Sequence, residues 1–155
     1  MLTINRARDS DVAAMHSLQM LAFEDEGRRC GTQDIPPLQE PMAAIAEHVR
    51  HGIALVARED DRIVGYVRGL IEGRVCTIRA LAVAPSRHGK GVGSALLSAL
   101  EAALGDIERV DLTTNTIMER NVPFYERHDY RVVEYTTPIA GIKLAQMSKS
   151  FPPVA

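Results

Sequence analysis

The chain reads LAVAPSRHGKGVGS from Leu81 to Ser94, and this segment carries the most specific pattern in the sequence. An apolar segment ends at Val83, and Pro85 stops the hydrogen-bond ladder of a strand. Three alternating glycines then lead into an apolar-periodic segment. Glycine allows positive φ and close approach of a ligand to the backbone. The first amides of a helix lack partners within the helix and lie at its positive end. The pattern therefore predicts a strand, a phosphate-binding loop and a helix in succession.

Other phosphate-binding patterns fit this stretch less well. A Walker loop requires Gly-Lys followed by Ser or Thr, whereas Gly91 follows Gly89 and Lys90 here. A dinucleotide fingerprint requires three glycines spaced GxGxxG directly after the strand, and Ser94 stands in place of the third. A nucleotide-binding oxidoreductase stays open as an alternative, as does a glycine-rich helix start that binds nothing.

Outward from this stretch, the rest of the chain alternates between helical and strand patterns. Apolar residues spaced with a period of 3.6 residues predict a first helix capped by Asp9 or Ser10, with further helices at about 41–51, 91–104 and 122–127. Period-two and short apolar runs predict strands at 2–6, 53–58, 63–70, 75–83, 110–114, 131–135 and 142–148. Polar and turn-forming residues predict a loop from Glu24 to Pro37.

The apolar faces of three helices follow from the same spacing. We expect the first helix to bury Ala14, Leu18, Leu21 and Ala22; the second to bury Met42, Ile45, Ala46 and Val49; and the third to bury Val92, Leu96, Ala99, Leu100 and Ala103.

The connections predict a mixed sheet. Short turns at Asp60–Asp61 and Gly73–Arg74 suit antiparallel hairpins. The strand 75–83, the helix after it and the strand 110–114 form a βαβ-like unit with parallel strands. We expect a single domain over residues 1–155, of the α/β (mixed, α+β) class, with helices on both faces of the sheet.

Composition limits the partners and the cellular setting. The formal net charge of −2 argues against nucleic acid and anionic membrane as partners. Cys30 and Cys76 lack CxxC spacing, and His48 and His51 have no third ligand at a suitable spacing, so we expect neither a disulfide framework nor a metal site. No apolar run approaches the length that spans a bilayer, which predicts a cytoplasmic protein.

The glycine-rich stretch resembles the acyl-coenzyme A signature of the GNAT superfamily of N-acetyltransferases. That signature reads Gln or Arg, two residues, Gly, one residue, then Gly or Ala. Here it falls on His88, Gly91 and Gly93, after the typical Leu-Ala-Val-x-Pro strand end. His88 takes the place of the usual Gln or Arg, with Arg87 beside it.

A second family motif resembles the segment from Asn121 to Tyr130, which reads NVPFYERHDY. The family ends this motif with Gly and an aromatic residue, whereas Asp129 replaces the glycine here. The order of elements also resembles the family over nearly the whole chain. The resemblance implies a mostly antiparallel GNAT-like sheet with one splayed parallel pair.

The resemblance also implies acetyl-coenzyme A as cosubstrate and residues that bind it. The pantetheine arm pairs with the strand before the signature, and the loop amides hold the pyrophosphate. The implied coenzyme-binding residues are Leu81, Ala82, Val83, Arg87, His88, Gly89, Lys90, Gly91, Val92, Gly93, Ser94, Asn121 and Tyr125. For Asn121, a helix cap stays open as an alternative.

Tyr125 is the implied general acid for the leaving thiolate. A thiol has a pKa near ~8.5 and a tyrosine near ~10, so the proton transfer has a modest cost. The alternative is that Tyr125 and Phe124 only pack under the sheet. An amide near Val83 is expected to stabilise the oxyanion.

The general base is not assigned by the resemblance. Many family members place a glutamate on the signature strand, but the matching position here is Arg79. The acidic group Glu24, Asp25 and Glu26 and the separate Glu72 are candidates by composition only. The acidic group either attracts a cationic acceptor or forms a solvated loop, and the arginines that follow favour the loop.

The main functional hypothesis is acetyl transfer to a primary amine of a small molecule, peptide or protein. An acyl-coenzyme A-binding sensor without turnover is the alternative within the same fold. Dimers are common in folds of this kind, so the resemblance also suggests a homodimer.

Overall fold

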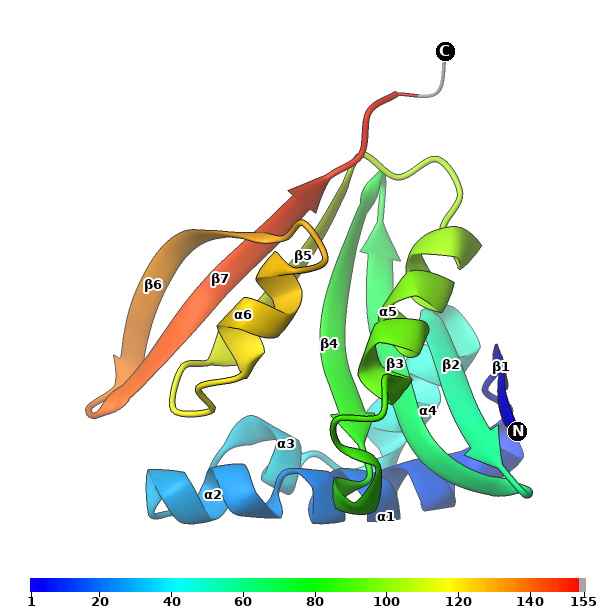
Figure 1. Ribbon diagram of the computed structural model, residues 1–155, viewed down its shortest axis with the longest axis horizontal. Coiled ribbons are helices and arrows are strands. Elements are labelled where there is room, and N and C mark those ends of the chain that lie inside the picture. Colours follow the sequence, from blue (N-terminus) through cyan, green and yellow to red (C-terminus); the bar gives the residue numbers. More distant parts are fainter. Residues whose placement is uncertain (154–155) are drawn as a thin grey trace.

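A mixed sheet of seven strands, in the order β1-β2-β3-β4-β5-β7-β6, forms the centre of the computed structural model, which describes residues 1–153 (Figure 1). The strands are β1 Leu2–Arg6, β2 Ile53–Glu59, β3 Arg62–Glu72, β4 Val75–Val83, β5 Arg109–Asn115, β6 Arg131–Ile139 and β7 Ile142–Ser150. Neighbouring strands are antiparallel except β4 and β5, which are parallel. The mixed sheet with one parallel pair confirms the predicted fold class.

The parallel strands β4 and β5 pair only over their first residues. Val75–Ile78 lie opposite Arg109–Leu112. Beyond them β4 stays with β3 as far as Val83, and β5 stays with β7 as far as Asn115. Figure 1 shows the gap between β4 and β5 widening along the strands. One backbone edge of each strand is therefore left without a strand partner.

A bulge in β4 lies at the point where the two strands separate. The register with β3 shifts between Ile78 and Ala80, which leaves Arg79 without a partner residue in β3. An extra residue of this kind bends its strand and increases the local twist. The bulge therefore helps to turn β4 away from β5.

Helices cover both faces of the sheet. They are α1 Val12–Ala22, α2 Glu24–Cys30, α3 Pro36–Gln39, α4 Met42–His51, α5 Val92–Ala103 and α6 Asn121–Glu126, with 3-10 turns η1 Asp9–Asp11 and η2 Pro85–Arg87. α5 packs on β2, β3 and β4 from one side, and α1 and α4 pack from the other. α6 contacts β5 and β6 on the α5 side (Figure 1).

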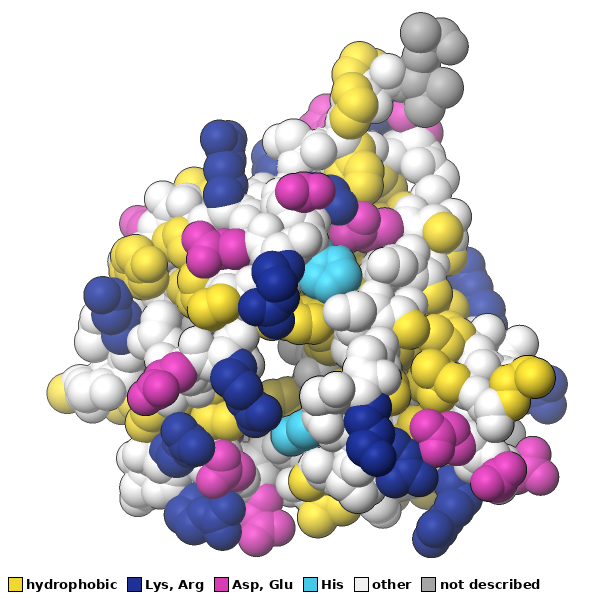
Figure 2. Space-filling model, in the orientation of Figure 1, with side chains coloured by type: hydrophobic (Ala, Val, Ile, Leu, Met, Phe, Trp, Pro, Cys, Tyr) yellow, Lys and Arg dark blue, Asp and Glu magenta, His cyan; other side chains and the backbone are white. Residues whose placement is uncertain are grey.

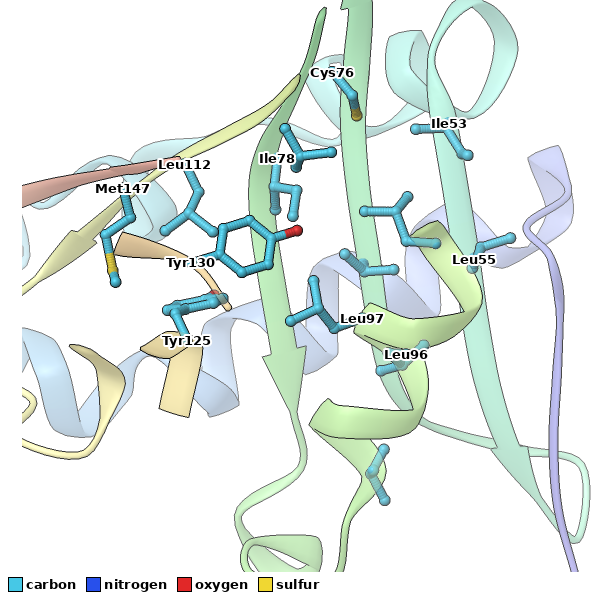
Figure 3. Packing of buried hydrophobic residues seen from close by; sticks show 14 of the residues in the cluster. Ile53, Leu55, Cys76, Ile78, Leu96, Leu97, Leu112, Tyr125, Tyr130 and Met147 are labelled. Carbon is cyan, nitrogen blue, oxygen red and sulfur yellow. The ribbon is translucent and has the colours of Figure 1, made fainter. Parts of the chain in front are cut away.

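The larger part of the core lies between the sheet, α5 and α6. Leu96, Leu97 and Leu100 of α5 are completely buried there. Tyr125 and Tyr130 lie beside each other against the sheet (Figure 3), with ring centroids 5.9 Å apart. Burying such large side chains excludes water from this layer and fixes α6 near the widening gap.

A buried polar network links the other face of the sheet to α1, α4 and the segment between them. Arg68 of β3 is fully buried and forms a salt bridge with Glu40. Its guanidinium also lies 2.6 Å from His48 Nδ1 and donates to Gln19 Oε1 at 3.0 Å. The Tyr66 hydroxyl donates to the same Gln19 oxygen. Burial and the charge of Arg68 lower the pKa of His48, which favours its neutral form.

The apolar face predicted for the first helix was partly wrong. α1 buries Val12, Met15 and Leu18, whereas Leu21 is 52% exposed. Gln19 also lies on the buried face, because the network satisfies its amide. The predicted cap was wrong as well, since Asp11 accepts from the Arg8 amide and neither Asp9 nor Ser10 caps α1.

The faces of α4 and α5 also differ in detail from the prediction. α4 leaves Met42 49% exposed and buries His48 beside Ile45, because Arg68 contacts the imidazole. α5 buries Leu97, while Ala103 is exposed beyond the edge of the sheet.

The loop predicted between Glu24 and Pro37 is also wrong, because its first part is the helix α2. Acidic residues occupy its first turn, and Arg28 and Arg29 its last turn, which complements the helix dipole. Asp25 forms salt bridges with both arginines, and Gly31 ends the helix with a φ of +72°. The charges that indicated a solvated loop stabilise a short helix instead.

Among the described residues, no helix is both long and apolar enough to cross a bilayer.

Candidate functional site

A cavity of about 430 Å³ opens where β4 and β5 separate. Residues from α1, α2, the end of β4, the loop before α5 and the α6 region line it. They are Ala22, Phe23, Glu26, Leu81, Ala82, Val83, Arg87, His88, Gly89, Gly91, Val92, Gly93, Ser94, Met118, Arg120, Asn121, Phe124, Tyr125 and Arg127. Figure 2 shows this face of the molecule hollowed near its centre, with basic side chains on the rim.

The structure brings together nearly all residues that the sequence predicted for coenzyme binding. The end of β4, the glycine loop, Asn121 and Tyr125 all line the cavity. Lys90 belongs to the same loop but is exposed and does not line the cavity.

The glycine loop has the backbone conformation that the sequence predicted. Gly89 and Gly91 have φ values of +76° and +81°, which strain any other L-residue. Gly91 is the N-cap of α5, so the unpaired amides of the first helical turn begin there, at the edge of the cavity. An anion bound at this end meets amide donors and the positive end of the dipole of a 12-residue helix.

Side chains tie the loop to the strands beside it. The His88 ring nitrogen Nε2 lies 3.2 Å from the Val83 carbonyl oxygen. Arg87 forms a salt bridge of 2.9 Å with Glu59 of β2. These contacts hold the loop to the ends of β2 and β4 before any ligand binds.

The third glycine allows close packing between α5 and α6. A Cβ atom at Gly93 would lie 3.4 Å from the Phe124 ring. Phe124 in turn makes an edge contact with Tyr125, with ring centroids 5.0 Å apart. Gly93 therefore lets α6 approach the start of α5 and sets the width of the cavity.

Two cations in the cavity were missed by the sequence prediction. Arg120 and Arg127 flank α6 and line the cavity opposite the glycine loop. Within residues 1–153 neither forms a salt bridge, whereas Arg87 is paired with Glu59. No spacing rule points to them, because the fold of α6 against β5 brings them to the cavity.

Tyr125 lies at the inner wall of the cavity. It is 9% exposed, and in the described part of the chain its hydroxyl has no hydrogen-bond partner. The unpaired hydroxyl is not fully buried, and because Tyr125 lines the cavity, the hydroxyl is open to it. Burial raises the pKa of Tyr125 above the ordinary value for tyrosine, and the nearby charge of Glu26 raises it further.

Two polar residues of the segment from Asn121 to Tyr130, Asn121 and Asp129, have defined structural roles. Asn121 donates to Thr114 Oγ1 at 2.9 Å and makes no cap bond to α6, so the helix-cap alternative is wrong. Asp129 has a φ of +71°, the left-handed conformation that favours glycine. Aspartate is one of the few other residues that adopt it readily, so the turn to Tyr130 forms.

Glu26 is the acidic residue that enters the cavity. It is 8% exposed, and Asn115 Nδ2 donates to its carboxylate at 3.5 Å. Burial raises the pKa of Glu26 above its ordinary value, although the Asn115 hydrogen bond opposes this shift. The sequence predicted it only as one of several acids in a loop. The helical spacing that turns it inward, while Glu24 stays exposed, was the missing signal.

Comparison with protein families gives one match. A family model described as an acetyltransferase (GNAT) domain matches residues 50–132, a range that contains the glycine loop and Tyr125. A search of curated protein sequences finds no match.

Solved structures show the same fold at low sequence identity. The ribosomal-protein-S18-alanine N-acetyltransferase from Escherichia coli is 15% identical with a TM-score of 0.81, covering 100% of this chain and 97% of its own. The PaiA N-acetyltransferase from Thermoplasma acidophilum, in complex with coenzyme A, is 13% identical with a TM-score of 0.80, over 97% and 99% of the two chains. Arabidopsis thaliana Naa50, in complex with the bisubstrate analogue CoA-Ac-MVNAL, is 18% identical with a TM-score of 0.74, also over 97% and 99%.

Proposed function

The chain belongs to the GNAT family of acetyltransferases, and from this premise we propose that it transfers the acetyl group of acetyl-coenzyme A to a primary amine of a small molecule, peptide or protein. The observation that carries the proposal is the cavity, which joins an anion-binding helix start, a free strand edge and a tyrosine hydroxyl. The family match also removes the nucleotide-binding oxidoreductase from consideration.

The residues present fit acetyl-coenzyme A. The amides from Gly89 to Ser94 would bind the pyrophosphate, with Arg120 and Arg127 as further cations on the opposite wall. The free edge of β4 at Leu81–Val83 would pair with the amides of the pantetheine arm, since it has no strand partner there. The related PaiA enzyme was solved with coenzyme A, which supports this placement.

The proposed reaction is direct attack of the amine nitrogen on the thioester carbon. A backbone amide near Val83 stabilises the tetrahedral oxyanion. The carbon–sulfur bond then breaks, and Tyr125 donates its hydroxyl proton to the thiolate. The raised pKa of Tyr125 keeps this hydroxyl protonated throughout the neutral pH range, and it makes proton transfer to the thiolate more costly than the ordinary tyrosine value implies.

An amine at the end of a peptide is one acceptor that this geometry allows. The related Naa50 structure holds an analogue in which coenzyme A is joined through an acetyl group to a peptide. A cytoplasmic location and a homodimer stay predictions from the sequence.

Binding of coenzyme tests the proposed site directly. We expect Gly91→Glu to weaken the binding of acetyl-coenzyme A by about tenfold or more, equivalent to about 1.4 kcal/mol. The substitution adds an anion at the start of α5, where the pyrophosphate would bind, and strains a residue with a φ of +81°. Isothermal titration calorimetry of both proteins measures the change.

Gly141→Glu is the matched control for this experiment. Gly141 has a φ of +84°, no atom would contact its Cβ, and it lies outside the cavity. This variant carries the same charge and a similar backbone strain, so it should bind coenzyme normally. Equal loss in the two variants, or no binding by the parent protein, would refute the placement of the coenzyme.

A further inference from the structure

Glu26 differs from the other acidic residues of its helix in facing the cavity. Glu24 is exposed, and Asp25 is neutralised by Arg28 and Arg29 at the surface. The Glu26 side chain instead lies against the wall that also contains Phe23 and Tyr125.

Glu26 is also a buried carboxylate without a cation. Asp11, the other buried carboxylate, accepts two bonds of 2.8 Å from Arg58. Within residues 1–153, Glu26 forms no salt bridge, and its hydrogen bond comes from the amide of Asn115, which is shared with Cys30 Sγ at 3.3 Å. Buried charges in proteins are normally paired, so an unpaired one that lines a cavity indicates a cationic ligand.

We propose that Glu26 contacts the ammonium group of the acceptor and takes its proton before attack on the thioester. The proposal rests on the proposed function, and it names the residue that the signature strand does not provide, because Arg79 stands there. Glu26 reaches the cavity from α2, near Tyr125.

The proton balance of the reaction fits this arrangement. An ammonium group has three N–H protons and the amide product has one. The first proton passes to the Glu26 carboxylate and from there to solvent. The second leaves the nitrogen after attack and replaces the proton that Tyr125 gives to the thiolate. No oxidant, reductant or further reactant is needed.

The environment of Glu26 favours proton transfer. An alkylamine has a pKa near ~10.4, so its deprotonation by an ordinary carboxylate is strongly uphill. Burial raises the pKa of Glu26 and reduces that difference. Other ionisable groups that line the cavity are Tyr125 from α6, His88 from the glycine loop, and the arginines Arg87, Arg120 and Arg127. Cys30 of α2 lies behind it and shares the Asn115 amide with Glu26.

The test compares Glu26→Gln with wild type, using ethylamine and hydroxylamine as probe acceptors for acetyl-coenzyme A. Ethylamine is protonated at pH 7.5 and requires a base, whereas hydroxylamine is weakly basic and already neutral. Thiol release gives kcat/KM for each amine. We expect Glu26→Gln to lower the value for ethylamine by about 100-fold or more and the value for hydroxylamine by less than about tenfold.

The pH profile provides a readout that a purely structural role would not change. In wild type, kcat/KM for ethylamine should rise as the pH passes through the raised pKa of Glu26, because only the carboxylate accepts a proton. This rise should be absent in Glu26→Gln. Glu24→Gln, the same substitution two residues earlier at an exposed position, should behave as wild type.

Each outcome decides the proposal. Equal losses for the two amines in Glu26→Gln, or an unchanged pH profile, would overturn the role of Glu26 while leaving the proposed function intact. Coenzyme affinity measured on the same variant shows whether the fold is retained, and Glu26→Asp should recover part of the ethylamine rate if the carboxylate is required. Absence of thiol release by wild type with both amines, despite coenzyme binding, would overturn the proposed function and this proposal with it.

Discussion

Replacement of Tyr125 by phenylalanine is expected to lower kcat by about 10²–10⁴-fold, the range that a general acid contributes. The hydroxyl opens to the cavity and has no protein partner in the described part of the chain, so its removal leaves no buried group unsatisfied. The phenylalanine ring keeps the edge contacts with Phe124 and Tyr130. Steady-state kinetics and a coenzyme titration on the same preparation should show lost turnover with nearly unchanged binding.

Tyr130→Phe is a matched control, because it makes the same chemical change in the adjacent ring. The Tyr130 hydroxyl donates to Glu101 at 2.9 Å, away from the cavity. Its loss should reduce the free energy of unfolding by about 1 kcal/mol and change kcat less than about threefold. A similar fall of kcat in both variants, or full activity of Tyr125→Phe, would remove Tyr125 from the mechanism.

The largest loss of stability is expected for Arg68→Ala. It should lower the free energy of unfolding by about 3–5 kcal/mol, which is typical when one partner of a buried ion pair is removed. Burial raises the pKa of Glu40, but hydrogen bonds from Gln19 and Arg68 and the charge of Arg68 hold it below the ordinary value, so Glu40 would lose part of this stabilisation. His48 and Gln19 would each lose a hydrogen-bond partner. Urea denaturation measures the loss.

A double substitution separates the contribution of the buried charges to the free energy of unfolding from the contribution of side-chain packing. Arg68→Met with Glu40→Leu replaces both members of the pair by apolar side chains, a change that is often neutral for buried pairs. We expect the double variant to recover most of the stability that Arg68→Ala loses. Additive losses across the two positions would show that Arg68 and Glu40 are not coupled.

The sequence predicted the parts of the fold that depend on local patterns. The hairpin turn at Asp60–Asp61 forms with φ values of +48° and +66°, and the strand Val75–Val83 has the predicted bounds. Pro85 and the glycines after it likewise lie where the sequence predicted β4 to end and α5 to begin. Nearly all the residues predicted from the signature and the α6 motif line the cavity, whereas its lining from α1, α2 and the two arginines beside α6 was not predicted.

Features that depend on tertiary contacts were not predictable from local patterns. Gln19, His48 and Arg68 are polar and yet buried, because they hydrogen-bond to one another across three elements. The position of β7 between β5 and β6 is set by long-range pairing, which a hydrophobic period does not reveal. Glu26 was not predicted at the cavity for the same reason, since its position depends on the direction in which a short charged helix faces.

The short seam between β4 and β5 also affects how the molecule can open. Among the described residues, strand pairing joins the first four strands to the last three only from Val75–Arg109 to Ile78–Leu112, whereas β3 and β4 are paired from Gly65 to Glu72. Local unfolding proceeds through the boundaries that have the fewest contacts. We therefore expect β4 and β5 to separate more readily than β3 and β4, and a ligand bound across the seam to oppose that separation. The binding energy of the ligand adds to the stability of this boundary, so native-state hydrogen exchange should slow on both sides at once.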